Sequence, residues 1–210
     1  MRYYAFGTTP TANNTNARHQ AAIHGTITKR TEVARRMFQL RFGDLDISDK
    51  TIEQLRGMEG KRIKALYQDL GARHGVTWKG RNYDTSNWQL SDNLNRSVSA
   101  ANAALYALTT AVVGSLGYLP QLGFIHASGT LPFVFDIADL YKPETTLPAA
   151  FQTIALKPEA DEKDTIKALK KLVESTRLLN RMPKDIQQLL DFPKPPPRAR
   201  AKIVRKGPPS

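Results

Sequence analysis

The sequence predicts a mainly α, multi-helical fold. Three observations support this prediction. Apolar side chains recur at helical spacing along several segments, helix-start and helix-end signals flank those segments, and only residues 2–6 read as a strand. The chain has 210 residues and no cysteine, so an apolar core must stabilise it without disulfides. The missing cysteine also excludes thiol nucleophiles and thiolate metal sites.

The N-terminal half is predicted to contain three helices. The first two cover residues 13–24 and 28–42, and Gly43 ends the second. A capping box at residues 51–54, formed by a threonine and a glutamine, begins the third helix. This third helix stops near residues 71–75, where glycine recurs.

A loop over residues 76–90 is predicted to precede a long central helix. Ser91 or Asp92 can cap that helix. Its apolar face, at helical spacing, comprises Leu94, Val98, Ala101, Leu105, Leu108, Val112 and Leu116. Gly117 and Pro120 then terminate the helix.

Shorter helices are predicted to follow the central one. The first covers residues 131–142, and the next starts near residue 146. A last pair spans residues 162–190 and is predicted to break at Met182 and Pro183, because proline cannot complete the helical hydrogen-bond pattern.

The chain is strongly basic, with a net charge of +12. Residues 193–210 hold six cations, six of the thirteen prolines and no acid, which leaves +6 for residues 1–192. A segment of that composition cannot bury enough apolar surface to fold alone, so we expect a disordered tail. The basic body is consistent with a polyanionic partner such as nucleic acid, and we expect the tail to contribute a salt-sensitive part of binding.

Glu59 interrupts the apolar face of the third helix. That face comprises Ile52, Leu55, Ile63, Leu66 and Leu70. Gly57 and Gly60 flank Glu59 and leave room beside it, at about 1 kcal/mol of helix propensity each. Burying a carboxylate is costly unless a positive group meets it. An ion pair with Arg56 or Arg62, each one turn away, is the ordinary explanation, and a bound cation is the other.

Residues 97–135 contain no Asp, Glu, Lys or Arg. A membrane span is one interpretation of such a run. Polar residues and Pro120 interrupt it, however, and no part is continuously apolar over the length of a span. We therefore favour a central helix buried on most sides. The N-terminus also has no long apolar segment of the signal-peptide type, so a cytoplasmic location and no membrane partner are expected.

His126 lies inside this uncharged stretch, and Asp136 and Asp139 are the first charged residues after it. The i, i+3 spacing of the two acids places them on one helical face. Taken singly, His126 could be a satisfied core histidine and Asp136 a helix cap. Together with Glu59, one histidine and two or three carboxylates suit a divalent ion such as Mg²⁺ or Mn²⁺, which serves phosphoryl-transfer chemistry.

Several segments of the chain resemble the integrase of CRISPR spacer acquisition in its type I-E form. They are residues 35–43, 53–60, 75–84, 123–126 and 136–139. The similarity runs from about residue 2 to at least residue 151. It implies that Glu59, His126 and Asp139 are metal ligands for Mg²⁺ or Mn²⁺, and that Asp136 is a further acid of the catalytic site.

The resemblance also implies a reaction and its partners. In the family, the free 3′-OH of a short foreign DNA duplex attacks a phosphodiester at the repeat boundary of the CRISPR array, a metal-dependent transesterification. The same site can run the reverse reaction or nick branched DNA. Expected partners are double-stranded and branched DNA and a small ferredoxin-like CRISPR adaptation protein. The expected DNA-binding residues are Arg2, Arg56, Arg62, Arg81, Tyr83, Trp88, Tyr106 and Lys142.

The resemblance finally divides the chain into three parts. Residues 1–10 resemble the last strand and linker of an N-terminal β domain, residues 11–192 form a helical catalytic domain, and residues 193–210 form the basic, proline-rich tail. Because the β domain supports dimerisation in the family, a homodimer is expected for the family but is open for this chain. The alternative function is therefore a catalytically silent or nicking-only DNA-binding subunit of an assembly.

Overall fold

The computed structural model describes residues 15–80 and 92–193 of the chain. These residues form helices and loops with no strand among them, which confirms the predicted mainly α fold. In chain order the helices are α1 (Thr15–His24), α2 (Ile27–Phe42), α3 (Ile52–His74), α4 (Asn93–Ser115), α5 (Pro132–Ala138), the 3-10 helix η2 (Lys142–Glu144), α6 (Thr146–Leu156), α7 (Glu162–Ser175) and α8 (Leu178–Leu189). The strand predicted at residues 2–6 and the tail beyond residue 193 lie outside the described residues.

The predicted ends of α2 and α3 are confirmed. Gly43 follows α2 with φ 63°, a conformation that glycine adopts without strain. The capping box of α3 is complete, because the Gln54 N–H donates to Thr51 Oγ1 (3.2 Å) and the Thr51 N–H donates to Gln54 Oε1 (2.8 Å). Gly75 ends α3 in the left-handed conformation, with φ 65°.

The C-terminal helices break at a different place from the one predicted. α7 and α8 separate around Arg177, which lies in the left-handed region with φ 50°. Met182 and Pro183 lie inside α8, so the predicted break there is wrong. Pro183 removes one helical hydrogen bond, to the carbonyl of the half-exposed Leu179, and the complete burial of Met182 and Ile186 offsets that loss.

The helix predicted over residues 131–142 is also shorter than expected. α5 ends at Ala138, and η2 begins at Lys142. Pro143 has no N–H to donate to the Asp139 carbonyl, so α-helical hydrogen bonding cannot continue through this segment. Asp139 is therefore the C-terminal cap of α5 rather than a residue inside a longer helix.

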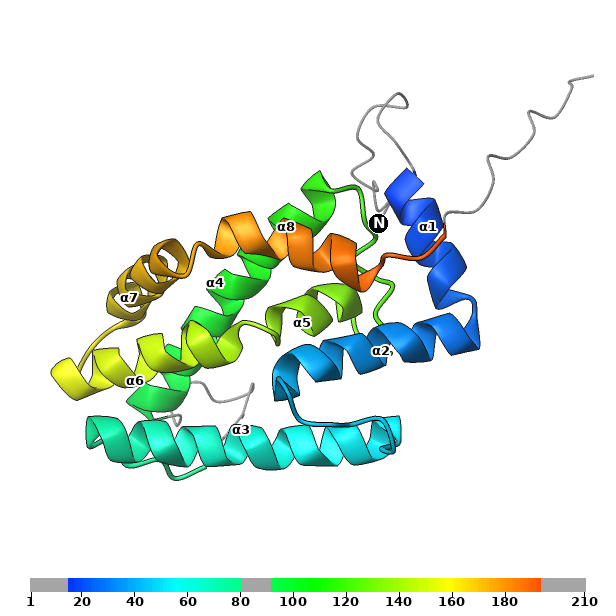
Figure 1. Cartoon of the computed structure of the whole chain (residues 1–210). Coiled ribbons are helices and arrows are strands. Elements are labelled where there is room, and N and C mark those ends of the chain that lie inside the picture. The colour runs from blue at the N-terminus through cyan, green and yellow to red at the C-terminus, as the bar shows by residue number, and fades with distance from the viewer. Residues whose placement is uncertain (1–14, 81–91, 194–210) are drawn as a thin grey trace, which may run out of the picture.

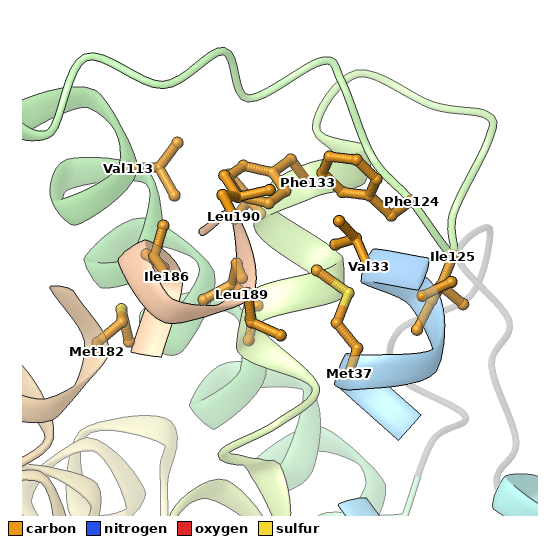
Figure 2. Packing of buried hydrophobic residues seen from close by; sticks show 14 of the residues in the cluster. Val33, Met37, Val113, Phe124, Ile125, Phe133, Met182, Ile186, Leu189 and Leu190 are labelled. Atoms are coloured by element: carbon orange, nitrogen blue, oxygen red, sulfur yellow. The ribbon is translucent and has the colours of Figure 1, made fainter. Parts of the chain in front are cut away.

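The largest hydrophobic core lies between α2, α4, α5 and α8. Figure 2 shows its side chains converging from these helices and from the segment that holds Phe124 and Ile125. Val33 and Met37 of α2 and Phe133 of α5 are completely buried. The Phe124 ring packs against Phe133 of α5 (centroids 5.8 Å apart) and against His24 of α1 (5.9 Å), so the core holds the segment before His126 in place.

α4 is the central helix of the domain. Figure 1 shows it crossing behind α8 and α6, and it packs against these two helices and against α5 and α7. Among the described residues it is the one helix long and apolar enough to cross a membrane, but a core helix meets the same criterion. Its predicted apolar face is buried from Leu94 to Leu105, after which Thr109 and Val113 become the buried positions. This packing supports the interpretation of α4 as a core helix.

α1 fixes the segment that connects α4 with the His126 loop. The completely buried Gln20 donates from Nε2 to the carbonyls of Leu119 (3.1 Å) and Leu122 (3.0 Å). Its Oε1 accepts a hydrogen bond from the Leu119 N–H (2.7 Å). These three bonds hold the chain just before His126.

Candidate functional site

The loop that carries His126 is built around the Asp136 carboxylate. Asp136 is completely buried, and its two oxygens accept hydrogen bonds from the backbone N–H groups of Phe124, Ile125 (3.0 Å) and His126 (2.9 Å). Asp136 Oδ1 also lies 2.7 Å from His126 Nδ1. Hydrogen bonds to a charged acceptor are stronger than neutral ones, so this carboxylate both shapes the loop and orients the imidazole.

The second acid of α5 faces the other ring nitrogen of the same histidine. Asp139 Oδ2 lies 3.9 Å from His126 Nε2. Both acids at the C-terminal end of α5 thus lie beside His126, but in different roles. Asp136 is behind the imidazole and out of solvent, whereas the His126 side chain is 40% exposed and that of Asp139 is 22% exposed.

Glu59 lies on α3, and two arginines meet its carboxylate. Arg62, one turn along α3, donates from Nε to Oε2 (2.8 Å) and from Nη2 to Oε1 (3.0 Å). Arg41 comes from the last turn of α2, and its Nη1 lies 3.8 Å from Glu59 Oε1. The predicted ion pair with Arg62 is present, while Arg56 instead donates to the Ile125 carbonyl (2.5 Å).

A cavity of about 580 Å³ joins the two sides of the site. Glu59 and Asp139 both line it, together with the cations Lys64 and Lys142. Aromatic side chains and Asn102 also line it, as do Gly60, Ile63 and Leu147. The aromatic residues are Tyr67, Trp78 and Tyr106, and the Tyr67 and Trp78 rings stack with centroids 4.8 Å apart.

Lys142 connects Asp139 with an aromatic wall of the cavity. Its Nζ lies 2.5 Å from Asp139 Oδ1, and it donates a hydrogen bond to the Tyr106 hydroxyl (2.6 Å). Burial works to lower the pKa of the Lys142 ammonium, but Asp139 and Tyr106 outweigh burial, so the pKa lies above its ordinary value. Lys142 is therefore charged at neutral pH.

The predicted site residues are brought together only in part. His126 meets both aspartates, and Glu59 shares a cavity with Asp139. Within residues 15–80 and 92–193, no three histidine or acidic side chains stand close enough together to hold a metal ion. Instead, Glu59 forms an ion pair with Arg62, and Asp139 forms one with Lys142.

The predicted DNA-binding residues divide into two groups. Those that the structure describes lie at the site: Arg56 supports the His126 loop, Arg62 pairs with Glu59, and Tyr106 and Lys142 line the cavity. The others lie outside the described residues, and they are Arg2, Arg81, Tyr83 and Trp88.

Several residues of the site were not predicted from the sequence. Arg41, Lys64 and Trp78 all lie at Glu59 or along the cavity, yet none was predicted to belong there. Arg41 is one of several cations on α2, and the sequence pattern does not distinguish it from the others. Its position in the segment at residues 35–43, which resembles the integrase family, was the available signal.

Fold and site together define a general class, a helical domain in which two carboxylates line a cavity with lysines and aromatic side chains, and a histidine lies beside one of these carboxylates. The comparisons with known proteins then identify the family. The family model described as CRISPR associated protein Cas1 matches residues 8–188. The chain belongs to the Cas1 family.

Curated relatives agree with this assignment. A protein of Chlorobaculum tepidum named CRISPR-associated endonuclease Cas1 2 is 38% identical over 191 residues, which cover 90% of this chain and 64% of that protein. CRISPR-associated endonuclease Cas1 of Geobacter sulfurreducens is 37% identical over 209 residues, covering 97% of this chain and 68% of the relative. The chain thus spans about two thirds of the length of these relatives.

Solved structures share the fold. The crystal structure described as a TtCas1–DNA complex has a TM-score of 0.83 and 40% identity, with 91% of this chain and 72% of that chain covered. A CAS1 protein from Thermotoga maritima has a TM-score of 0.66 at 16% identity, over 85% of this chain and 70% of that chain, which shows a common fold.

Proposed function

We propose that this chain is a metal-dependent DNA endonuclease and integrase of CRISPR adaptation, of the type I-E form. The observation that carries the proposal is the His126 arrangement. Asp136 holds Nδ1, and Nε2 is directed to the side where Asp139 lies. A carboxylate that fixes one ring nitrogen of a histidine, so that the other can bind a metal, recurs in metal sites.

The donor set fits a divalent cation of the Mg²⁺ or Mn²⁺ type. Glu59, His126 and Asp139 would hold the ion, supplying two carboxylates and one neutral nitrogen. When bound, the ion would orient the scissile phosphate and stabilise charge on its oxygens and on the leaving 3′-oxygen. Asp136 would act through His126 and hold its imidazole in the orientation that binds.

Arg62 and Lys142 would exchange their carboxylate partners for DNA phosphates when the ion and the DNA bind. The Arg62 side chain is 30% exposed and the Lys142 side chain 21% exposed, and each neutralises a carboxylate that the proposal assigns to the ion. Once the carboxylates bind the ion, both cations become available to DNA phosphates. The nucleophile is the 3′-OH of the DNA in integration, so the reaction requires no nucleophilic side chain.

Double-stranded and branched DNA are the proposed substrates, and a small ferredoxin-like adaptation protein is the proposed partner. The cavity at Glu59 supports the first proposal, because it combines cations with aromatic walls, the two features that bind phosphates and unstacked bases. The segments at residues 53–60 and 123–126 support the type I-E form. Residues 193–197 support the partner, because this proline-rich sequence resembles the tail that family members use against that protein.

Strand transfer and nicking of a branched DNA substrate with Mn²⁺ test the proposal. Glu59→Ala and His126→Ala should each lower both rates by at least about 100-fold, since each removes one of three ligands. Arg73→Ala is a suitable control. Its side chain is 61% exposed at the far end of α3, where it pairs with Asp69, and it should retain the full rate.

Undiminished strand transfer in either site variant would contradict the assignment. A wild-type chain that binds branched DNA but neither joins nor nicks it would favour the alternative of a silent assembly subunit. Nicking without joining, with the same loss in both variants, would show that the metal site works while the arrangement needed for integration is missing.

A further inference from the structure

Arg41 is a buried cation at the junction of both sides of the site, and the metal-ligand set proposed above does not include it. We infer that Arg41 is a positioning residue, which fixes Glu59 relative to α5 and so sets the separation of the two halves of the metal site. The inference rests on the proposed metal site for its functional meaning. Its structural part can be tested without a metal.

The contacts of Arg41 connect three helices. Its guanidinium belongs to the end of α2, its Nη1 lies 3.8 Å from Glu59 Oε1 on α3, and its Nη2 donates to the Asp136 carbonyl on α5 (3.2 Å). The same guanidinium lies 5.4 Å from the centre of the Phe38 ring. One rigid planar group thus binds a proposed metal ligand and the backbone of the residue that organises His126.

The two arginines that contact Glu59 differ in how far their side chains are buried. The Arg41 side chain is 3% exposed, whereas that of Arg62 is 30% exposed. Arg62 also sits on the same helix as Glu59, so its ion pair does not fix the distance between helices. Arg62 can move into solvent when an ion binds, but Arg41 would leave a buried cavity and an unpaired carbonyl. The two arginines therefore have different roles at one carboxylate.

A purely electrostatic role of Arg41 and a positioning role predict opposite changes in metal affinity when Arg41 is replaced. If Arg41 acted only through its charge, it would repel a divalent cation, and its removal would tighten binding. If Arg41 positions the ligands, its removal loosens the geometry and weakens binding. Residues that orient metal ligands typically contribute roughly 10- to 100-fold to metal affinity. The sign of the change thus distinguishes the two roles.

Arg35 provides a matched control on the same helix. It donates from Nη1 to the Ile47 carbonyl (3.2 Å) and from Nη2 to the Lys50 carbonyl (2.6 Å). Like Arg41, it joins α2 to another segment through backbone carbonyls. Among the described residues, however, it forms no ion pair with an acid. Loss of Arg35 should destabilise the chain without acting on the metal site.

The experiment compares Arg41→Met, Arg41→Lys, Arg62→Met and Arg35→Met in the full chain. Mn²⁺ affinity is measured by titration calorimetry without DNA, at a temperature where circular dichroism shows every variant folded. Amide hydrogen exchange without metal follows Phe124, Ile125 and His126, whose N–H groups bind Asp136. Lysine keeps the charge of Arg41 but cannot bind two partners with a planar fork.

We expect both Arg41 variants to bind Mn²⁺ at least tenfold more weakly and to exchange the three amides faster. Arg62→Met should bind Mn²⁺ more tightly, since a competing cation is lost. Arg35→Met should leave affinity and these amides unchanged while the Lys50 amide, bonded to the Ile47 carbonyl, exchanges faster.

Tighter or unchanged Mn²⁺ binding in Arg41→Met would overturn the positioning role, as would full rescue by Arg41→Lys. A wild-type chain that binds no Mn²⁺ would refute the proposed metal site. In that case the exchange data still decide the structural part, and unchanged exchange of the three amides in Arg41→Met would refute it as well.

Discussion

The two sides of the candidate site are constructed differently. On the α5 side, a completely buried Asp136 accepts hydrogen bonds from three backbone amides and also binds His126. On the α3 side, Glu59 is partly exposed and is held mainly by Arg62, a side chain with access to solvent. The α5 side is therefore preorganised, while the α3 side holds an ion pair that can exchange.

The glycines of the two sides differ in the space around them. A Cβ added at Gly123 would lie 2.5 Å from the His126 carbonyl oxygen and 2.6 Å from Pro132 Cβ. A Cβ added at Gly57 or Gly60 would meet nothing within 4 Å. The histidine loop thus leaves no space for a side chain, whereas α3 leaves open space beside its carboxylate. A preorganised side and an adjustable side together would let the site hold a ligand set yet admit a large substrate.

The largest expected effect comes from breaking the α5 side at Asp136. Asp136→Asn should cost about 3–5 kcal/mol of unfolding free energy, because an amide group replaces a buried charged acceptor of several hydrogen bonds. Urea denaturation followed by circular dichroism measures this change.

Asp139→Asn is the matched control, since it makes the same chemical change three residues away. The Asp139 side chain is 22% exposed and its main partner is the partly buried Lys142, so this variant should cost about 1–2 kcal/mol, less than Asp136→Asn. Equal losses in the two variants would mean that Asp136 does not organise the loop.

The helix ends and the position of the two acids of α5 could be predicted from the sequence, because residues close together in the chain determine them. The capping box at Thr51 and the glycines after α2 and α3 depend on residues within one turn, so their pattern is visible in the chain. The acids at Asp136 and Asp139 were likewise expected on one helical face, and both do reach His126.

The remaining features depend on contacts between distant segments. The sequence could not show that Asp136 would bind backbone amides of residues 124–126, since those amides face it only after the loop folds over α5. Arg41 joins the site for the same reason. The break predicted at Pro183 was wrong because burial of Met182 and its neighbours outweighs the missing hydrogen bond.

An intermediate effect is expected from Gly123→Ala, which overfills the histidine loop. Overpacking usually costs about 1–3 kcal/mol, and the contacts with backbone atoms place this variant at the upper end. The same urea denaturation should show the loss, and hydrogen exchange should become faster at residues 124–126. A variant as stable as the wild type would show that the loop can shift to accept a methyl group.

The smallest effect concerns the adjustable side, at Gly57 and Gly60 of α3. Each replacement by alanine should raise the unfolding free energy by about 0.5–1 kcal/mol, because alanine favours the helix and has open space for its methyl group. Gly60 lines the cavity beside Glu59, and Gly57 does not. If the cavity admits DNA close to the α3 backbone, Gly60→Ala should weaken DNA binding while Gly57→Ala leaves it unchanged.

Fluorescence anisotropy with a labelled branched DNA measures that difference at matched salt, since phosphate contacts depend on ionic strength. The stability gain acts as an internal check, because it should be the same in both variants. Equal DNA affinity of the two stabilised variants would mean that the space at Gly60 is not used by the substrate. Weaker binding by Gly60→Ala alone would show that α3 gives up helix stability at this position to let DNA approach Glu59.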